Sequence, residues 1–292
     1  MMLRLNVIML VDETGKNLLM CKRLRNPYKG LYNFVGGKAD EGEDGLHAAY
    51  RELREETGVT AADVCLHHLA TFSYMSGGAG LPPYELQAYV GRLRHAVAVN
   101  GDENPLEWQP MEQDFFDMNR FAGEGSVGHI VESVRRYRQD WFERDELHMN
   151  LVPLSEEDLP IIAYYQSTTA EALAPMLAAS RRKRHEGRYY EQFAVRVNEC
   201  LVGTVSLFGQ EDGTVCDGVD VFPPFCCCGF AYNALTKLMD VARAQCFTVQ
   251  TAQIRTDNAA SIALHEKLGF VPGEAWTNRR GHEVRTWRKE LL

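Results

Sequence analysis

The stretch from Gly36 to Val59, GGKADEGEDGLHAAYRELREETGV, is the feature that most constrains the fold of this chain. A glycine-rich turn leads into a segment with helical periodicity over residues 44–57, whose apolar positions form a single stripe. At about 100° per residue, Glu52, Glu55 and Glu56 share another face of that helix. Like charges three or four residues apart each cost a few tenths of a kcal/mol on an isolated helix, so the gathered carboxylates need an explanation. The apolar stripe consists of Leu46, Ala49, Tyr50 and Leu53.

A hard divalent cation accounts for this cluster. Carboxylate oxygens are the ligands that Mg²⁺ prefers, and Mg²⁺ keeps positions free for water and phosphate oxygens. A metal that bridges a diphosphate neutralises its charge and generates an attacking hydroxide. The alternative is a solvated acidic helix face without a ligand. The combination of turn, helix and spacing favours a Mg²⁺ or Mn²⁺ site.

The composition bounds the class of protein. The chain has 292 residues, enough for two domains, with 45% hydrophobic and 24% charged residues, as in ordinary globular proteins. A formal net charge of -9 argues against general binding to nucleic acid or anionic membranes. No apolar run reaches the length of a membrane span or the pattern of a signal peptide. The eight cysteines form no CxxC pair, which favours reduced thiols and a cytoplasmic location.

Hydrophobic periodicity predicts an α/β (α+β) chain with two domains. We expect a first half over residues 1–145 and a second half over residues 150–292, with the boundary in a segment that lacks apolar alternation. Strands are predicted over 3–11, 18–23, 64–74, 84–94 and 106–109, then over 189–197, 200–208, 214–222, 247–254 and 283–289. Helices are predicted over 44–57, 126–139, 229–244 and 259–268, with a further helix start at Ser155.

The spacing from Gly37 matches every fixed position of the Nudix box: Gly, five residues, Glu43, seven residues, then REL-x-EE-x-GV. The first half therefore resembles the Nudix hydrolases. The resemblance implies an α/β/α sandwich with a mixed sheet. It implies metal ligation by Glu52, Glu55, Glu56 and the Gly36 carbonyl, with Glu52 also a candidate general base. Arg51 and Glu43 would form an orienting ion pair, and Gly58 would end the box. Asp102 and Glu103 are both candidates for one further carboxylate ligand.

The stretches GLYNFVGGK and LEW resemble the MutT-like branch, which hydrolyses oxidised purine nucleoside triphosphates such as 8-oxo-dGTP. That resemblance implies that Asn33 reads the purine edge, for which an amide that both donates and accepts is suited. Arg23 would meet the phosphates, Lys38 would assist, and Trp108 would stand near the base. The alternatives are a turn cap for Asn33, a strand-edge charge for Arg23 and a core position for Trp108.

The second half contains VDVFPPFCCCGFAYNALTKLMDVARAQ and, later, IRTDNAASIALHEKLGFVPGE. A strand, a Gly-x-Ala turn and a helix start form an anion site suited to pyrophosphate. Together the two stretches resemble the GNAT acetyltransferases, with a mixed sheet flanked by helices. The resemblance implies acetyl-CoA binding, and it places a proton donor for the departing thiolate at His265. The implied acetyl-CoA contacts are Val221, Cys226, Gly229, Phe230, Ala231 and Asn258.

Two departures from the GNAT pattern leave the second half open. Three cysteines, residues 226–228, replace the usual basic run, and His265 replaces a tyrosine. The loss of even one or two charge-assisted hydrogen bonds weakens binding at least tenfold. The half is therefore either an acetyltransferase with an unknown amine acceptor or a binding or dimerisation module. For the whole chain we expect Mg²⁺-dependent cleavage of a nucleoside triphosphate to monophosphate and pyrophosphate. ADP-ribose or another nucleoside diphosphate derivative is the alternative substrate.

Overall fold

A computed structural model describes residues 2–75, 83–101, 103–138, 140 and 146–291. The chain divides into two compact units, Met1–Leu147 and His148–Leu292. Each unit has its own mixed sheet and helices, so the predicted α/β class is confirmed. No helix within the described ranges is long and apolar enough to cross a membrane.

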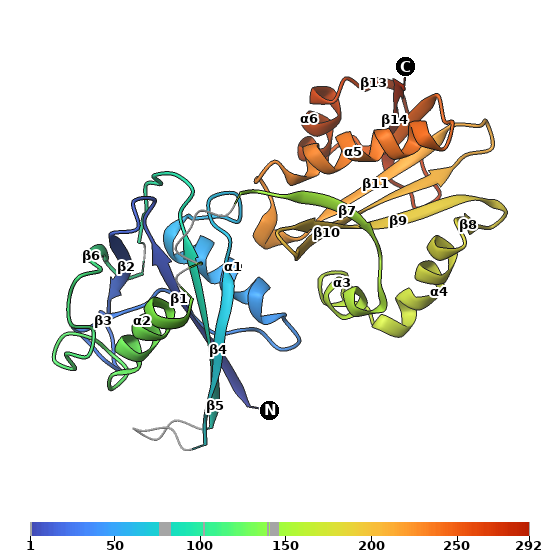
Figure 1. The fold of residues 1–292 in the computed structure, drawn as a ribbon. Helices are drawn as coiled ribbons and strands as arrows, with labels where there is room; N and C mark the ends of the chain where they lie inside the picture. The colour runs from blue at the N-terminus through green and yellow to red at the C-terminus, as the bar shows by residue number, and fades with distance from the viewer. Residues whose placement is uncertain (1, 76–82, 102, 139, 141–145, 292) are drawn as a thin grey trace. The chain divides into compact units, whose positions relative to one another are not determined.

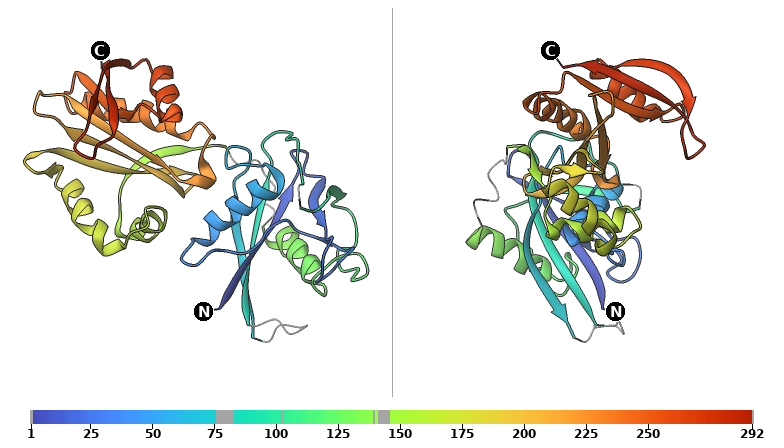
Figure 2. Two further views of the ribbon diagram at one scale, coloured as in Figure 1. Left: turned by 180° about the vertical axis from the view of Figure 1, so that it is seen from behind. Right: turned by 90° about the vertical axis from the view of Figure 1, so that its right-hand side faces the viewer.

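The first unit is built on a sheet in the order β3-β2-β1-β5-β4, with β6 paired to the free edge of β2 (Figure 1). Strands β1 and β5 run parallel and the other pairs are antiparallel. Alternate residues of the strands face opposite sides of the sheet, and helices α1 and α2 cover the two sides (Figure 2). The elements are β1 (Leu3–Val11), β2 (Asn17–Lys22), β3 (Tyr32–Asn33), α1 (Gly45–Thr57), β4 (His67–Tyr74), β5 (Tyr84–Arg92), β6 (Leu106–Pro110) and α2 (Ser126–Tyr137).

The core under α2 shows this alternation. Met9 and Val11 of β1 pack with Val127, Ile130 and Val131 of α2 and are fully or almost fully buried. The intervening residues of β1 therefore face α1. One sheet thus carries two apolar layers, and α1 lies over the layer that includes the glycine-rich turn.

The second unit has a sheet in the order β13-β14-β12-β11-β10-β9-β7. Only β11 and β12 are parallel, and they pair solely at Val215↔Gln250 and Cys216↔Thr251, so their carboxyl-terminal halves are unpaired with each other. The elements are β7 (Met149–Pro153), α3 (Leu159–Tyr165), α4 (Ala170–Arg181), β8 (Arg184–His185), β9 (Arg188–Val197), β10 (Cys200–Gly209), β11 (Val215–Val221), α5 (Phe230–Ala244), β12 (Val249–Arg255), α6 (Ala259–Lys267), β13 (Val271–Thr277) and β14 (Glu283–Glu290).

Candidate active site

Helix α1 is fixed at both ends by its own sequence. The Asp44 carboxylate accepts hydrogen bonds from the N–H groups of Leu46 and His47 at 3.0 and 3.2 Å, which satisfies two of the helix's free donors. Gly58 ends the helix in a left-handed conformation, φ 77°, and its N–H donates to the Arg54 carbonyl. These caps determine which turn of α1 faces the glycine-rich loop.

An ion pair joins the loop to the helix. Arg51 donates to both carboxylate oxygens of Glu43, at 2.9 and 3.0 Å, and Glu43 is only 2% exposed. The same guanidinium donates to the Lys38 carbonyl at 2.9 Å and to Glu52 at 2.8 Å. A bidentate pair of this kind fixes direction as well as distance, so the loop before α1 and the carboxylate face of α1 are held in one register.

The Gly36–Gly37 turn lies against β1 and the carboxylates. Gly36 has φ 138°, and a Cβ there would stand 2.4 Å from the Asn6 carbonyl oxygen, so no other residue fits without displacing backbone. Asn6 holds Gly37 twice: its N–H donates to the Gly37 carbonyl at 2.8 Å, and its Oδ1 accepts from the Gly37 N–H at 3.2 Å. The Gly36 N–H in turn donates to Glu56 at 2.8 Å.

These elements enclose a cavity of about 570 Å³, within the range of small-molecule sites. Its lining combines carboxylates from α1, the glycine turn, two arginines from the β2–β3 loop and the segment before β6. The lining residues are Arg23, Leu24, Arg25, Asn26, Gly36, Gly37, Glu52, Glu56, Glu103 and Asn104.

Burial perturbs the two carboxylates of α1 that line the cavity. Burial, together with the neighbouring charges of Glu52 and Glu103, raises the pKa of Glu56 to about 7, against the hydrogen bond from Gly36 and the charge of Arg23. Burial also raises the pKa of Glu52, against its hydrogen bond from Arg51. Three carboxylates around one cavity, two of them with raised pKa values, form an environment that a cation would stabilise.

The donors around this cavity fit a hard divalent cation, because they are carboxylate oxygens beside a glycine turn that leaves room for close approach. The third predicted ligand, Glu55, is 60% exposed, does not line the cavity and accepts a hydrogen bond from Arg51 at 3.2 Å. Within the described part of the chain, no three histidine, cysteine or acidic side chains already stand in a ligating arrangement. The cavity therefore holds Glu52 and Glu56 together, and Glu55 lies beside them on the helix.

Of the two candidates for a further carboxylate, Asp102 lies outside the described residues. Glu103 lines the cavity and acts electrostatically on Glu56. Its neighbour Asn104 accepts a hydrogen bond from the Leu24 N–H at 3.1 Å. The segment that brings Glu103 to the cavity therefore also braces the loop that carries the arginines.

The residues expected to meet a base lie near this cavity but do not line it. Asn33 and Leu106 are both paired with Cys21, from opposite edges of β2, so the three share a face of the sheet. Trp108 lies two residues after Leu106 on that face. Asn33 Oδ1 accepts from the Phe34 N–H at 2.9 Å, which leaves its NH₂ group as the donor. Lys38 is exposed and contributes only its carbonyl to the site.

Sequence reasoning missed several residues of the cavity. Arg25 follows Arg23 at the spacing of an extended chain, and this alternation was the available signal. Asn6 and Asn104 carried no local signal, because both act through contacts with backbone far away in the chain. Asn6 lies 31 residues before Gly37, and Asn104 lies 80 residues after Leu24.

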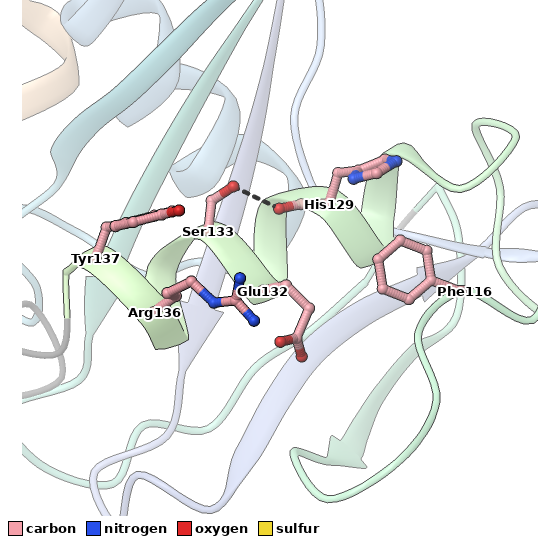
Figure 3. A pocket seen from close by; sticks show the side chains of 6 residues that line it. All are labelled: Phe116, His129, Glu132, Ser133, Arg136 and Tyr137. Carbon is pink, nitrogen blue, oxygen red and sulfur yellow. Dashed lines mark hydrogen bonds between the residues drawn. The ribbon is translucent and has the colours of Figure 1, made fainter.

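A second cavity, of about 420 Å³, lies on the exposed side of α2 (Figure 3). Phe116 packs edge-on against His129 with ring centroids 5.0 Å apart, and Ser133 donates back to the His129 carbonyl at 2.7 Å. Its single carboxylate, Glu132, is paired with Arg135. None of the residues singled out in the sequence lies here, and the lining offers no cluster of metal-binding oxygens.

In the second unit, the loop before α5 is compact. Gly229, with φ 80°, precedes α5, and no side chain caps the helix. The Cys226 thiol donates to the Val221 carbonyl at 3.3 Å, whereas Cys227 is exposed. Lys267 places its ammonium 4.8 Å from the ring centroid of Tyr232, in the first turn of α5. A cation therefore lies beside the uncapped helix start, although the loop itself has no basic residue.

The other expected acetyl-CoA contacts have structural partners. Phe230 is 1% exposed and packs in the core. Asn258 is the N-cap of α6, and its Oδ1 accepts from the Ser261 N–H at 3.1 Å. Ala231 follows Phe230 in the first turn of α5 and remains a backbone candidate.

His265, the expected proton donor to a departing thiolate, is buried and hydrogen-bonded within the second unit. The side chain is 2% exposed, with Nε2 3.4 Å from Asp217 and Nδ1 2.8 Å from the Ser261 carbonyl. Asp217 also accepts from Gln250 at 2.6 Å. Burial lowers the pKa of His265, but the hydrogen bond and charge of Asp217 outweigh it and the net pKa is raised. His265 is therefore part of a buried network between α6 and the diverging strands β11 and β12.

Family models account for both units. A model of the NUDIX domain matches residues 2–165, more than half of the chain. The chain belongs to the Nudix family. A model of the acetyltransferase (GNAT) family matches residues 134–270. The chain thus combines a Nudix domain with a GNAT domain, and both indicate an enzyme.

Two curated relatives resemble the Nudix unit. An ADP-ribose pyrophosphatase of Methanocaldococcus jannaschii is 28% identical over 109 residues, covering 37% of this chain and 59% of the relative. A CTP pyrophosphohydrolase of Escherichia coli is 38% identical over 55 residues, covering 19% of this chain and 41% of the relative. The chain thus spans about three fifths and two fifths of these two proteins.

Solved acetyltransferases resemble the second unit at low identity. A Salmonella typhimurium protein assigned as an acetyltransferase, solved with acetyl-CoA, is 19% identical with a TM-score of 0.43, covering 51% of this chain and 95% of that one. An N-acetyltransferase of Staphylococcus aureus Mu50 is 18% identical with a TM-score of 0.43, covering 50% of this chain and 99% of that one.

Proposed function

We propose that the Nudix unit, residues 1–145, hydrolyses a phosphoanhydride bond of a nucleoside triphosphate. The observation that carries the proposal is the single cavity that brings together Glu52, Glu56, Glu103 and Arg23. Carboxylates that repel one another across a cavity with an arginine are suited to an anionic substrate bound together with cations.

In the proposed reaction, a water oxygen attacks the α-phosphorus and the bond to the bridging oxygen breaks. The products are a nucleoside monophosphate and pyrophosphate. Bound Mg²⁺ or Mn²⁺, on Glu52, Glu56, Glu55 and the Gly36 carbonyl, would neutralise phosphate oxygens and activate the water. Glu52 is the candidate base for the water proton. Arg23 donates hydrogen bonds to phosphate oxygens.

For the base we propose an oxidised purine such as 8-oxo-dGTP, so that the reaction removes damaged nucleotides from the pool. Asn33 and Trp108 flank β2 on the face that also bears Cys21, which lies beside Glu56. With neighbouring strands about 4.8 Å apart, side chains two strands apart stand about 10 Å from each other, enough for a base. The free NH₂ group of Asn33 would donate to the base edge.

The test is Mg²⁺-dependent hydrolysis of 8-oxo-dGTP beside dGTP, CTP, ADP-ribose and UDP-glucose, with products identified by mass. We expect 8-oxo-dGMP and pyrophosphate, formed in preference to the products from dGTP. Asn33→Ala should erase this preference. Turnover of ADP-ribose as the preferred substrate would refute the triphosphate assignment and retain the metal-dependent chemistry.

Glu56→Gln is the matched inactive variant. The amide still accepts the Gly36 hydrogen bond but carries no charge, so we expect hydrolysis to fall by at least about 100-fold, as on removing a major catalytic electrostatic group. The melting temperature of the metal-free protein should not fall, because a buried charge has been removed. Unchanged hydrolysis in this variant would contradict the site.

For the GNAT unit, residues 150–292, we propose acetyl transfer from acetyl-CoA to an amine, with the pyrophosphate held by the backbone amides of Gly229, Phe230 and Ala231. The uncapped start of α5 supports this. The absence of basic residues at 226–228 favours a second candidate, a non-catalytic binding or dimerisation module. Calorimetry with acetyl-CoA separates them: no binding at high micromolar concentration would refute acetyl transfer. If binding is weak, Cys227→Arg should strengthen it, because Cys227 is exposed and has room for a longer side chain.

A further inference from the structure

The two arginines of the β2–β3 loop differ from most cations of the Nudix unit in their lack of partners. Within the described residues, the guanidinium groups of Arg23 and Arg25 make no hydrogen bond or ion pair, and the buried Nε of Arg23 has no partner. By contrast, Arg51 contacts four groups of the loop and helix. An arginine that lines a cavity without a protein partner has its donors available to a ligand.

The loop holds the two arginines at different depths. Arg23 is half-buried, and its charge acts on Glu56, whereas Arg25 is exposed at the rim of the same cavity. The loop backbone is fixed: Arg23 exchanges backbone hydrogen bonds with Leu31 and Gly30 at 2.9 and 2.7 Å, and Asn104 holds the Leu24 N–H. Glu56 and Arg23 therefore lie deeper in the cavity than Arg25.

This order matches a chain of phosphates. The carboxylate wall can hold phosphates only through cations, so the cleaved part of the substrate belongs there. An arginine further out contacts phosphate oxygens directly and bidentately. A nucleoside triphosphate extends a third phosphate beyond the cleaved bond, whereas a nucleoside diphosphate or a diphosphate diester has none.

We propose that Arg25 binds the terminal phosphate and makes this cavity selective for nucleoside triphosphates over diphosphates. The inference rests on the proposed phosphoanhydride hydrolysis. It adds the residue that distinguishes nucleoside triphosphates from diphosphates. Arg23 serves both substrate classes, and Arg25 serves only the longer one.

The test uses binding, so that it does not depend on turnover. Calorimetry on the full chain with Ca²⁺ compares α,β-methylene dGTP with α,β-methylene dGDP, two ligands that differ only in the terminal phosphate. We expect the unaltered protein to bind the triphosphate at least tenfold more tightly. Arg25→Gln should reduce that ratio to below threefold by weakening triphosphate binding alone, and Arg25→Lys should restore part of it.

Lys29→Gln is the matched control, because Lys29 is an exposed cation of the same loop that does not line the cavity. It should leave the ratio unchanged. The inference is overturned if Arg25→Gln keeps the ratio, if it weakens both ligands equally, or if the unaltered protein binds both equally or neither. Selective triphosphate binding without hydrolysis of any nucleotide would refute the proposed function and retain the inference.

Discussion

At the scale of single residues, Asn6 shows how a side chain outside the Nudix box supports it. Its backbone and side chain both hold Gly37, and its carbonyl oxygen excludes a Cβ at Gly36. It is 2% exposed, and its Nδ2 has no partner within the described residues. The turn that donates to Glu56 is therefore positioned from the strand below.

Asn6→Ala should destabilise the Nudix unit by about 1–3 kcal/mol, because the partly buried Gly37 N–H loses its acceptor. It should also weaken Mn²⁺ binding, measured by electron paramagnetic resonance, since the turn beside Glu56 becomes less fixed. Asn100→Ala, at an exposed asparagine, is the control and should change stability by less than about 0.5 kcal/mol. Mn²⁺ affinity that stays unchanged in Asn6→Ala would mean that the turn keeps its position without this side chain.

At the scale of elements, α6 is joined to β11 by the buried pair of His265 and Asp217. The raised pKa of His265 means that the folded state binds its proton more tightly than the unfolded state. The stability from this pair is therefore fully present below the unfolded pKa, near 6.5, and is lost as pH rises through the folded value.

His265→Gln tests this linkage. Breaking a buried pair leaves Asp217 without its cation and should cost about 3–5 kcal/mol at pH 6. Differential scanning calorimetry of the full chain should be run from pH 6 to 9. In the unaltered protein, the melting temperature of one transition should fall as pH rises. In the variant, that melting temperature should depend less on pH. Asp217→Asn should also flatten the profile. If the melting temperature of His265→Gln depends on pH as strongly as that of the unaltered protein, another group causes the pH dependence.

At the scale of the whole molecule, the chain carries two units, each with its own sheet and core. The residues that line the cavity with Glu52 and Glu56 all come from residues 23–104, and the candidate acetyl-CoA residues all come from residues 221–258. The two proposed chemistries would therefore be supplied by separate sets of side chains.

Variants should accordingly affect one activity at a time. Glu56→Gln in the full chain should abolish nucleotide hydrolysis and leave acetyl-CoA affinity within twofold, as measured by calorimetry. Cys227→Arg should change acetyl-CoA affinity and leave hydrolysis within twofold. A change in both activities from either variant would show energetic coupling between the sites.

Local sequence pattern was enough to predict much of the secondary structure of this protein. The apolar stripe predicted α1 within one residue at its start, because it is set by residues three or four positions apart. The long strands were predicted for the same reason. The two-residue strands β3 and β8, the edge strands β7 and β13 and helix α4 were not predicted. The missed strands are defined by hydrogen bonds to other strands.

The sequence by itself determined the family and the α/β class, because these depend on residue type and on the spacing of apolar and charged residues along the chain. Only the tertiary structure decided that Glu103 and Arg25 share a cavity with Glu56, that Asn6 holds the glycine turn, and that His265 is buried against Asp217. In each case the residues that meet are at least 31 positions apart in the sequence. Such contacts follow from strand order and packing, which no local pattern encodes.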